Sequence, residues 1–540
     1  MNSSHNKYQL WPQIWLLFGV CFVGFSALLM PSGGLQDLSK LYTYGFVPAL
    51  AQRTLLPLVG IAVLSAAISF KLLYVVGGRD TTSHLSGPVR LEARKAAQDS
   101  RKKLYQEVRN DDLGKGVFLH PKVQISTRAE LSNILVYGQQ GSGKSVTIKP
   151  IVEQIRERGD RALIYDRKNE YTSLFLDRNS ILINPNDIRS FQWDISQDVR
   201  TEQDALLVAQ CLIEETPDPL WSEGARLLFT GMVVILLNRQ GSCSWYSLAG
   251  MLDTGERELQ AMLQTHYPKA AVFIQEQSKT TQGFLVTLIK NLHWISHLRA
   301  VWRRKAKNMF SVNAWLQATN SKKTLIVAHD DNIPDLSQKL CTTLFSLLVR
   351  NVLAMGDSET RKVWFVLDEL SSIPKGEALE MWLRLGRSKG ARTVAGLQAI
   401  SQLRTIYGSD QTETILSLFG HVIALRVGAA GGAAKYASES FGHHEVERYI
   451  RSVTSKGEES STQQISFEPL VRPEELVNLK YTSKGIHGFM MVGGRSTVYK
   501  LCWPFPKIEP VAESIVYQAS LDGVNPRVRK SKNRLRRRSK

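Results

Sequence analysis

The stretch that most constrains the fold is a glycine-rich octapeptide, G-Q-Q-G-S-G-K-S, at residues 138–145. An apolar run (residues 133–137) precedes it, and a helix-like segment (residues 146–158) follows it. This strand–loop–helix context is the one in which a G-x-x-x-x-G-K-[ST] pattern, the Walker A pattern, holds phosphate. Backbone N–H groups of such a loop, and the first turn of the helix, point at phosphate oxygens. We therefore predict an α/β fold that binds a nucleoside triphosphate.

Two side chains of the octapeptide have predicted roles. Lys144 is expected to reach the β- and γ-phosphates of ATP, and the Ser145 hydroxyl is expected to hold Mg²⁺. The complete predicted nucleotide-binding set is Gly138, Gln139, Gln140, Gly141, Ser142, Gly143, Lys144 and Ser145.

A second apolar run, residues 363–367, ends in two acids and predicts the other half of the site. A buried strand that presents Asp to the metal and Glu to an attacking water is a recurrent NTPase arrangement. We predict that Asp368 binds Mg²⁺ through water and that Glu369 is the general base. Asp-Glu after an apolar run is a weak signal alone, but it gains specificity from the phosphate loop.

Three more polar residues near predicted strands are candidates for the site. Gln398 follows the strand 392–397 and is expected to sense the γ-phosphate, and Arg387 is a candidate arginine finger. The alternative for Arg387 is a place on a solvated helix face. A finger that acts on a neighbouring subunit requires a ring assembly. Asp166, at the end of the strand 161–166, either orients water or Mg²⁺ or forms a turn.

Residues 195–317 have helical periodicity and almost no strand signal. The stretch is too long for a normal crossover connection, so we predict an inserted all-helical domain. It contains an interleaved basic and aromatic set: Lys290, Trp294, His297, Arg299, Trp302, Arg303, Arg304, Lys305 and Lys307. Such a set suits single-stranded DNA or an acidic partner. The alternative is a solvated face whose tryptophans belong to the core.

Two apolar segments near the N-terminus predict membrane spans, at about residues 11–30 and 55–76. Basic residues concentrate after the second segment, so the positive-inside rule places both the N-terminus and the long C-terminal part in the cytoplasm. A cleaved signal peptide is the competing interpretation of the first segment, but its apolar core is too long for one. We expect an inner-membrane protein with a short periplasmic loop.

The chain has 540 residues and a net charge of +19, which favours polyanionic partners such as nucleic acid or an anionic membrane face. Its five cysteines show no C-x-x-C spacing, which argues against a disulfide framework. The last residues, 525–540, form a basic tail expected to bind phosphate backbones or anionic lipid.

Together these features resemble the coupling proteins of conjugative type IV secretion systems, the TraD/TraG group of membrane-anchored hexameric ATPases. The most specific part of the likeness runs from residue 367 to residue 408. The residues that carry it are 138–145, 165–168, 184–185, 219–221, 225–226, 367–370, 373–374, 386–390, 398, 401–403 and 407–408.

The resemblance implies a RecA-like P-loop motor with an inserted all-helical domain, preceded by two transmembrane helices. The expected division is an anchor (1–80), a charged linker (81–113), the RecA-like domain (114–194 and 318–524), the all-α domain (195–317) and the basic tail (525–540). By analogy, Lys144 and Ser145 bind nucleotide, Asp368 and Glu369 serve metal and hydrolysis, Arg387 is the finger and Gln398 is the sensor.

The same resemblance implies a function. The protein is expected to be a homohexameric ATPase that receives a relaxase–DNA complex and delivers it to the type IV secretion channel during conjugation. Its partners would be single-stranded DNA, the relaxosome, channel components and the lipid bilayer. The alternative is a receptor for protein effectors with accessory ATPase activity. The short basic tail departs from the long acidic tail of many relatives, which leaves the helical domain as the expected receptor.

Overall fold

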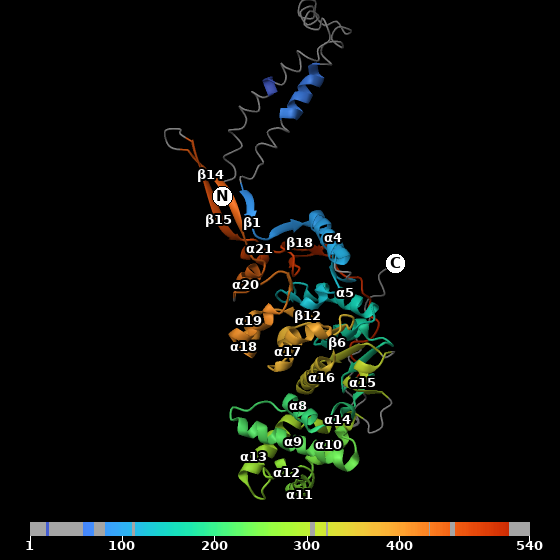
Figure 1. Ribbon diagram of the computed structural model, residues 1–540. Coiled ribbons are helices and arrows are strands. Elements are labelled where there is room, and N and C mark those ends of the chain that lie inside the picture. Colours follow the sequence, from blue (N-terminus) through green and yellow to red (C-terminus); the bar gives the residue numbers. More distant parts are fainter. Residues whose placement is uncertain are drawn as a thin grey trace, which may run out of the picture. The chain divides into compact units, whose positions relative to one another are not determined.

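A computed structural model describes residues 18–20, 58–69, 82–110, 114–302, 308–319, 322–430, 432–453 and 459–517 (Figure 1). The chain divides into two compact units. The first comprises Met1–Ser86 with Glu445–Glu468, and the second comprises Gly87–His444 with Pro469–Lys540.

The second unit is built around an 11-stranded mixed sheet. Its strand order is β2-β18-β17-β13-β5-β12-β11-β6-β10-β7, with β16 (Tyr481–Thr482) beside β17. The strands in that order are β2 (Val89–Glu92), β18 (Thr497–Trp503), β17 (Gly485–Met491), β13 (His421–Ala424), β5 (Ile134–Tyr137), β12 (Ala391–Leu397), β11 (Val363–Leu367), β6 (Arg161–Asp166), β10 (Thr324–Ala328) and β7 (Ser180–Ile183). From β13 to β7 all neighbours are parallel, whereas β17 is antiparallel to both β13 and β18.

The side chains of the parallel strands point alternately to the two faces of the sheet, and each face is packed in its own hydrophobic core. In β11, Phe365 belongs to one core and Trp364 to the other. Because both faces are covered, these strands are continuous apolar runs, as buried parallel sheets require. The helix α5 (Lys144–Glu157) buries Ile148 and Ile155 in one core, and α16 (Pro334–Ala354) buries Leu340 in the other.

Shorter helices and one further pair of strands complete this part of the second unit. They are α4 (Ala93–Asn110), β3 (Lys115–His120), β4 (Val123–Ser126), η1 (Ala129–Ser132), α6 (Glu170–Phe175), η2 (Leu370–Ser372), α17 (Glu377–Leu385), η3 (Gly386–Lys389), α18 (Ile400–Tyr407), α19 (Ser409–Ser417), α20 (Ala433–Ser440) and α21 (Pro473–Val477).

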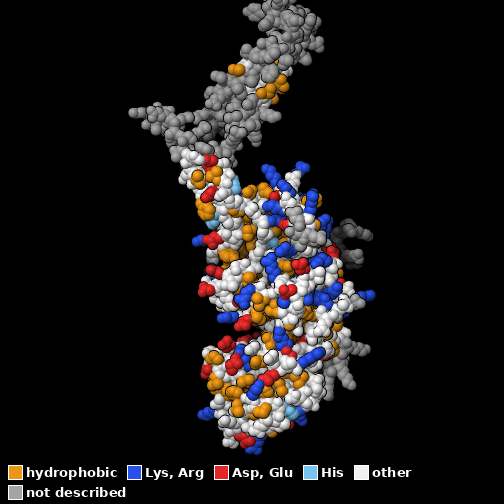
Figure 2. Space-filling model, viewed as in Figure 1, with side chains coloured by type: hydrophobic (Ala, Val, Ile, Leu, Met, Phe, Trp, Pro, Cys, Tyr) orange, Lys and Arg blue, Asp and Glu red, His pale blue; other side chains and the backbone are white. Residues whose placement is uncertain are grey.

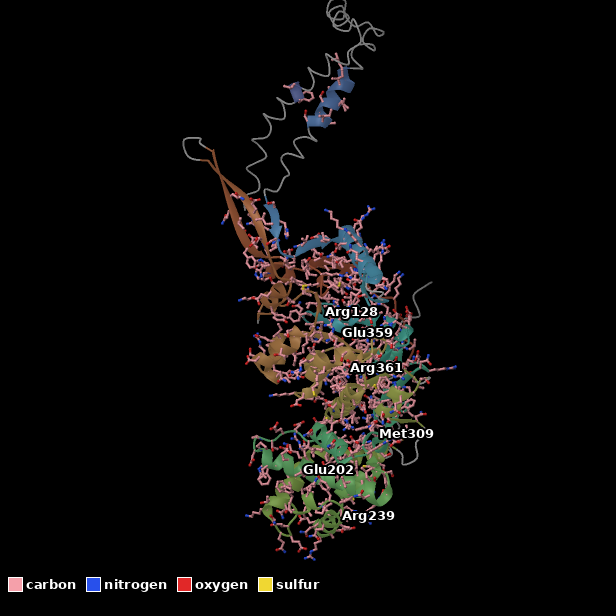
Figure 3. The ribbon with its side chains drawn as sticks, in the orientation of Figure 1. Arg128, Glu202, Arg239, Met309, Glu359 and Arg361 are labelled. Atoms are coloured by element: carbon pink, nitrogen blue, oxygen red, sulfur yellow. The ribbon has the colours of Figure 1, made fainter. Side chains whose placement is uncertain are left out.

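The region between β7 and β10 is helical and gathers at one end of the unit, drawn in green in Figure 1. Its helices are α7 (Ile195–Asp198), α8 (Glu202–Leu212), α9 (Pro219–Gln240), α10 (Trp245–Leu252), α11 (Glu256–His266), α12 (Pro268–Ala271), α13 (Lys279–Leu292), α14 (Ile295–Val301) and α15 (Val312–Gln317). Two short parallel strands, β8 (Gln192–Trp193) and β9 (Met309–Phe310), pair where the chain enters and where it leaves the helical region. Figure 3 labels Met309 there, and Glu202 and Arg239 among the helices.

The first unit contains a three-stranded sheet of β1 (Thr82–Ser86), β14 (His443–Val453) and β15 (Glu459–Pro469). β1 is antiparallel to β14, and the Ser83 hydroxyl donates to the Glu447 carboxylate at 2.8 Å. The sequence pattern did not predict this sheet, because its strands are rich in polar residues and lack the apolar runs on which strand prediction depends.

The predicted membrane spans lie largely outside the described residues, which include an apolar helix at Leu58–Ser69. Within the described part, one helix, Pro219–Gln240, is long and apolar enough to cross a bilayer, but 61% of its apolar window is buried inside the protein. This helix is α9, the central helix of the helical region. Its Gly224 and Gly231 pack directly against Phe284 and Leu263.

The stretch expected to be a charged linker, residues 81–113, contains regular structure. It holds β1, β2 and the 18-residue helix α4, and β2 pairs in parallel with β18 of the main sheet. The helical propensity was evident from the sequence, but the four-residue β2 was not, because two of its four residues are charged. The compact part of the second unit therefore begins before Gly114, the start expected from the sequence.

Candidate nucleotide site

The predicted phosphate loop connects β5 to α5. Two of its glycines have left-handed backbone, Gly141 with φ 73° and Gly143 with φ 97°. The left-handed backbone of Gly143 favours glycine, and a Cβ there would lie 1.9 Å from the Ile486 Cδ1 of β17, so that side chain would have to move. The loop then enters α5 at Lys144, with the N–H groups of the first helical turn free of helical partners.

Lys144 folds back over its own loop. Its Nζ donates to the Gly138 carbonyl at 2.9 Å and to the Gln139 carbonyl at 3.4 Å. Burial lowers the pKa of the Lys144 amine, and the nearby carboxylates of Glu369 and Asp368 act in the opposite direction. The amine is thus held at the loop by weak partners that a phosphate can replace.

Asp368 directly follows the fully buried strand β11 and faces the loop. Its Oδ1 accepts from the Ser145 hydroxyl at 3.3 Å and from the Tyr171 hydroxyl at 3.5 Å. The Lys168 amine lies 3.6 Å from the Asp368 Oδ2. The structure therefore brings together the two residues predicted to hold the metal, Ser145 and Asp368.

Glu369, the next residue, has a different set of partners from Asp368. Its Oε1 accepts from the Ser371 hydroxyl at 2.9 Å and from the Gln398 backbone N–H at 3.4 Å, whereas its Oε2 is buried without a hydrogen-bond partner in the described structure. Burial raises the pKa of Glu369, and the Ser371 hydrogen bond and the Lys144 charge oppose that rise. A carboxylate with one free oxygen and a raised pKa suits proton abstraction.

The donors and acceptors fit a nucleotide with Mg²⁺. The Ser142 hydroxyl in the loop, like the Glu369 Oε2, is buried without a protein partner in the described part. Buried polar atoms that lack partners are rare and need a ligand or water. The amine, loop N–H groups, hydroxyl and carboxylates supply the groups that phosphates and a hard divalent cation take.

Arg387 is not part of this constellation. It is exposed on η3, just before β12, and its side chain makes no hydrogen bond or ion pair with another described residue. The register that pairs Val363 with Ala391 and Leu367 with Ala395 puts Arg387 and Asp368 at opposite ends of these strands. Five strand residues separate the two ends by about 16 Å. Arg387 therefore cannot serve the site of its own chain.

Asp166 holds the first turn of α6 through one oxygen, while its Oδ1 is buried without a hydrogen-bond partner in the described structure. It is fully buried, and its Oδ2 accepts from the Thr172 N–H at 2.6 Å and from the Thr172 hydroxyl at 2.8 Å. Burial raises the pKa of Asp166 to about 6. The carboxylate fixes α6, the helix that carries Tyr171 to Asp368.

Sequence reasoning missed Tyr171 and Ser371 at this site. Ser371 lies two residues after Glu369, so its proximity could have been inferred from the sequence. Tyr171 had no such signal, because its approach to Asp368 depends on how α6 packs against the sheet.

The basic and aromatic stretch at 290–307 is not an exposed stacking surface in its described part. Trp294 and Trp302 are each only 4% exposed, and their rings lie 5.8 Å and 6.2 Å from that of the buried Trp245. The tryptophans belong to the core, so the idea that they stack on DNA bases is wrong. Residues 303–307, which include Arg303, Arg304, Lys305 and Lys307, lie outside the described structure.

Most of the chain is similar to known proteins, both in sequence and in structure. Residues 117–501 match the family model described as the type IV secretion-system coupling protein DNA-binding domain. The chain is 25% identical over 350 residues to the coupling protein TraD of Escherichia coli (strain K12), a match that covers 64% of this chain. It spans about half the length of that relative, 46%.

Solved structures agree in fold. The unbound conjugative coupling protein TrwBdeltaN70 superposes with a TM-score of 0.68 at 23% identity, covering 81% of this chain and 97% of that one. TrwB in complex with ADP and Mg²⁺ gives a TM-score of 0.66 at 23% identity, covering 81% of this chain and 98% of that one. The RecA-like motor with a helical domain is thus the fold of this chain. From the match of the family model over most of its length, the chain belongs to the type IV secretion-system coupling protein family.

Proposed function

We propose that this protein is an inner-membrane, ATP-driven DNA translocase that recruits a relaxase–DNA substrate and delivers it to a type IV secretion channel during conjugation. The observation that carries the proposal is the convergence of Lys144, Ser145, Asp368 and Glu369 at the carboxyl edge of the parallel sheet. Its membership of the coupling protein family supplies the cargo class and the secretion system.

The phosphate loop is assigned to ATP and the Ser145–Asp368 pair to Mg²⁺. TrwB, which shares the fold, has been solved with ADP and Mg²⁺ and with a non-hydrolysable ATP analogue, which supports the assignment. When bound, the cation supplies charge stabilisation to the transferred phosphoryl group. Lys144 binds phosphate oxygens, and the Ser145 hydroxyl and the Asp368 carboxylate hold the metal and its waters.

Glu369 is the general base of the proposed reaction. Its free Oε2 accepts a proton from a water, while the Ser371 hydroxyl holds Oε1 and fixes the orientation of the carboxylate. The Gln398 N–H contributes to the same carboxylate, and the Gln398 side chain, at the tip of β12, is assigned the role of γ-phosphate sensor.

Arg387 is proposed to act on the nucleotide of a neighbouring subunit. It is exposed and lies at the sheet edge opposite to the site of its own chain. A residue of one subunit that completes the site of the next makes the interface heterologous, and such interfaces close into rings. We assign the assembly as a homohexamer by analogy with the coupling proteins. The spans predicted at 11–30 and 55–76 anchor the ring, with both the N-terminus and the motor cytoplasmic.

The test is Lys144→Ala. Removing the amine is expected to abolish ATP hydrolysis and conjugative DNA transfer, while the protein still inserts into the membrane. The matched control is Lys149→Ala, which removes an amine from the same helix that pairs with Glu170 at 2.6 Å. Transfer that survives Lys144→Ala contradicts the motor proposal.

Cross-linking in cells identifies the cargo. DNA bound to the full-length protein during transfer is the expected result. Cargo that consists only of protein would contradict DNA translocation and favour an effector receptor.

A further inference from the structure

The helix α4 presents a basic surface. Five of its cations are exposed: Arg94, Lys95, Arg101, Lys102 and Arg109. Its two acids are engaged by other groups, Asp99 by Lys103 at 3.2 Å and Glu107 by Arg495 at 2.9 Å. Figure 2 shows Lys and Arg side chains gathered over this helix. The exposed face of α4 therefore carries positive charge without local compensation.

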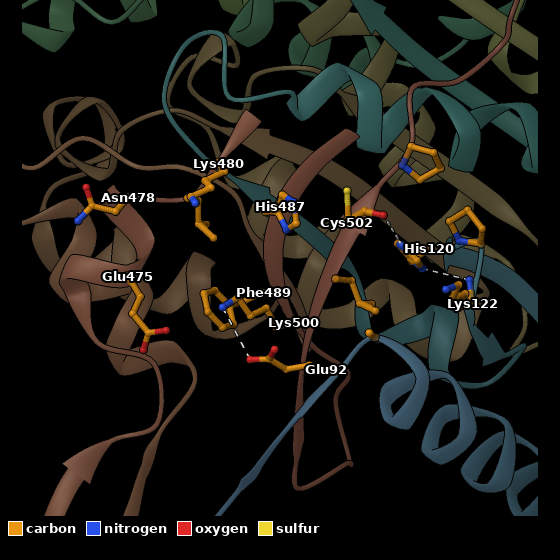
Figure 4. Close-up of a pocket in the computed structure, with 15 residues that line it drawn as sticks. Glu92, His120, Lys122, Glu475, Asn478, Lys480, His487, Phe489, Lys500 and Cys502 are labelled. Atoms are coloured by element: carbon orange, nitrogen blue, oxygen red, sulfur yellow. Dashed lines mark hydrogen bonds and ion pairs between the residues drawn. The ribbon is translucent and has the colours of Figure 1, made fainter. Parts of the chain in front are cut away.

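A cavity of about 760 Å³ opens where α4 begins (Figure 4). The last pair of the β2–β18 ladder is Glu92 with Lys500, and the chain then leaves the sheet at Ala93, the first residue of α4. Among the described strands, none consequently pairs with the end of β18 on that side. The cavity occupies this site and is unrelated to the nucleotide site, none of whose predicted residues line it.

The floor of the cavity is largely apolar. On one face of the β17–β18 hairpin, Phe489 pairs with Lys500 and His487 pairs with Cys502. Leu479, Leu501 and Pro504 add further apolar lining. Figure 4 shows Phe489 between Glu475 on one side and Cys502 with His120 on the other.

The rim has an excess of positive charge. Both lining carboxylates are already paired with Arg90, Glu475 at 2.7 Å and Glu92 at 2.8 Å. Lys122 and Lys480, by contrast, are exposed and form no ion pair with another described residue.

Two further groups complete the description of the rim. The Lys500 amine lies 3.7 Å from Glu92 and over the Phe489 ring. Both nitrogens of His120 are occupied, one by the Cys502 carbonyl and the other by the Lys122 N–H, and burial lowers its pKa. The charge offered to a ligand therefore comes from lysines.

We propose that this cavity binds one anionic phospholipid, whose phosphate contacts Lys122 and Lys480 and whose apolar part lies on Phe489, while the exposed cations of α4 lie against neighbouring headgroups. An apolar floor with a cationic rim matches an amphiphile whose only charge is anionic. The predicted second span ends near residue 76, and even a fully extended chain from there reaches α4 within about 56 Å. Basic clusters just cytoplasmic of a span bind the anionic leaflet.

The experiment uses Cys502 as a reporter, because its thiol lines the cavity. The full chain is placed in nanodiscs of phosphatidylcholine, alone or mixed with phosphatidylglycerol. Alkylation by uncharged N-ethylmaleimide is followed at Cys502 by peptide mapping. We expect the rate of Cys502 alkylation to be roughly fivefold or more lower in the anionic discs than in the phosphatidylcholine discs. Equal rates in the two kinds of disc overturn the proposal.

A double variant, Lys122→Gln with Lys480→Gln, separates the cavity from a general effect of surface charge. It retains the cations of α4 and is expected to lose most of the protection, because the two lysines are proposed to hold the phosphate. Lys435→Gln, on the exposed surface of α20, is the matched control and should keep it. If Cys502 of the double variant is protected as fully as in the wild type, the proposed contact of the lipid phosphate with Lys122 and Lys480 is contradicted.

Soluble glycerol phosphate added to neutral discs distinguishes the two sources of a phosphate group. Protection by this soluble anion equal to that by the anionic discs would overturn the lipid assignment. The proposal is independent of ATP hydrolysis, so Lys144→Ala should show the same protection as the wild type.

Discussion

At the scale of the single residue, Glu369 is the side chain that we propose as the general base of ATP hydrolysis. Replacing it by Gln keeps the shape and the Ser371 and Gln398 contacts but removes the basic oxygen. We expect Glu369→Gln to lower kcat by about 10²- to 10⁴-fold while ATP still binds. Turnover and binding of a fluorescent nucleotide, measured on the same preparation, check this. Loss of binding in parallel would contradict the role as base.

The environment of Glu369 also predicts a pH dependence. Burial raises its pKa, and a base must be ionised to act, so activity should fall on acidification at a higher pH than for an ordinary carboxyl group. The Ser371 hydroxyl stabilises the ionised form. Ser371→Ala should therefore raise the pKa further and move the acid limb of the kcat profile upward by roughly half to one pH unit. Ser372→Ala is the matched control. If Ser371→Ala leaves the acid limb of the kcat profile at the same pH, the result would count against Glu369 as the base.

At the scale of the element, α16 connects the helical region to the catalytic edge through two consecutive residues. Gln338 donates to the Ser372 carbonyl at 3.1 Å, three residues from Glu369. Lys339 donates to the Asn291 backbone carbonyl at 3.2 Å and to its side-chain oxygen at 3.3 Å, in α13. We therefore expect a displacement of α13 to be transmitted through α16 to the segment next to Glu369.

This connection predicts that Lys339→Met uncouples stimulation from hydrolysis. The basal ATPase rate should stay near that of the wild type, because no group at the nucleotide is removed. Stimulation by single-stranded DNA should fall about fivefold or more, the usual size of a coupling between sites. Asn351→Ala, in the same helix but bonded only to the Leu347 carbonyl, is the control. Unchanged stimulation in Lys339→Met would remove α16 from the coupling route.

The elements differ in how far the sequence predicts them. The central parallel strands β6, β11 and β12 were predicted within about one residue, because strands covered on both faces must be apolar throughout. The strands β1, β2, β14 and β15 were missed, since charged and hydroxyl side chains interrupt them and pairing between distant segments stabilises them.

The site shows the same division. Lys144, Ser145, Asp368 and Glu369 were predicted because they follow strands whose carboxyl ends must meet at one sheet edge. Tyr171 could not be predicted, since its place depends on a helix packing from the side. The tryptophans that flank α14, Trp294 and Trp302, were the opposite case: the sequence marked them as a possible DNA surface, but the residue pattern alone does not say which side of a helix is buried.

At the scale of the whole molecule, Arg387 makes the proposed assembly testable. Arg387→Ala should leave nucleotide binding intact and lower oligomer ATPase activity by about 10³-fold, as loss of a finger does elsewhere. Arg384→Ala removes an exposed arginine that already pairs with Glu380, and it should keep activity. Nearly normal activity in Arg387→Ala would contradict the finger.

Mixed assemblies sharpen that prediction. Arg387→Ala subunits lack the finger and Glu369→Gln subunits lack the base, so each homogeneous assembly should be inactive. In a mixture, a Glu369→Gln subunit can present its intact Arg387 to the intact base of an Arg387→Ala neighbour. ATPase activity should reappear on mixing and vary with the ratio of the two. Failure to recover any activity would place the finger elsewhere.

The two-residue strands β8 and β9 have a consequence for how such proteins diversify. The chain leaves the motor at Trp193 and returns at Met309, and the two points are adjacent because these strands pair. The loop between them can change in length, sequence or cargo preference while its ends stay at a fixed spacing. Transplanting residues 194–308 from one relative to another therefore leaves the strand order of the ATPase unchanged. We therefore expect the helical region to diverge among relatives independently of the sheet that carries the proposed nucleotide site.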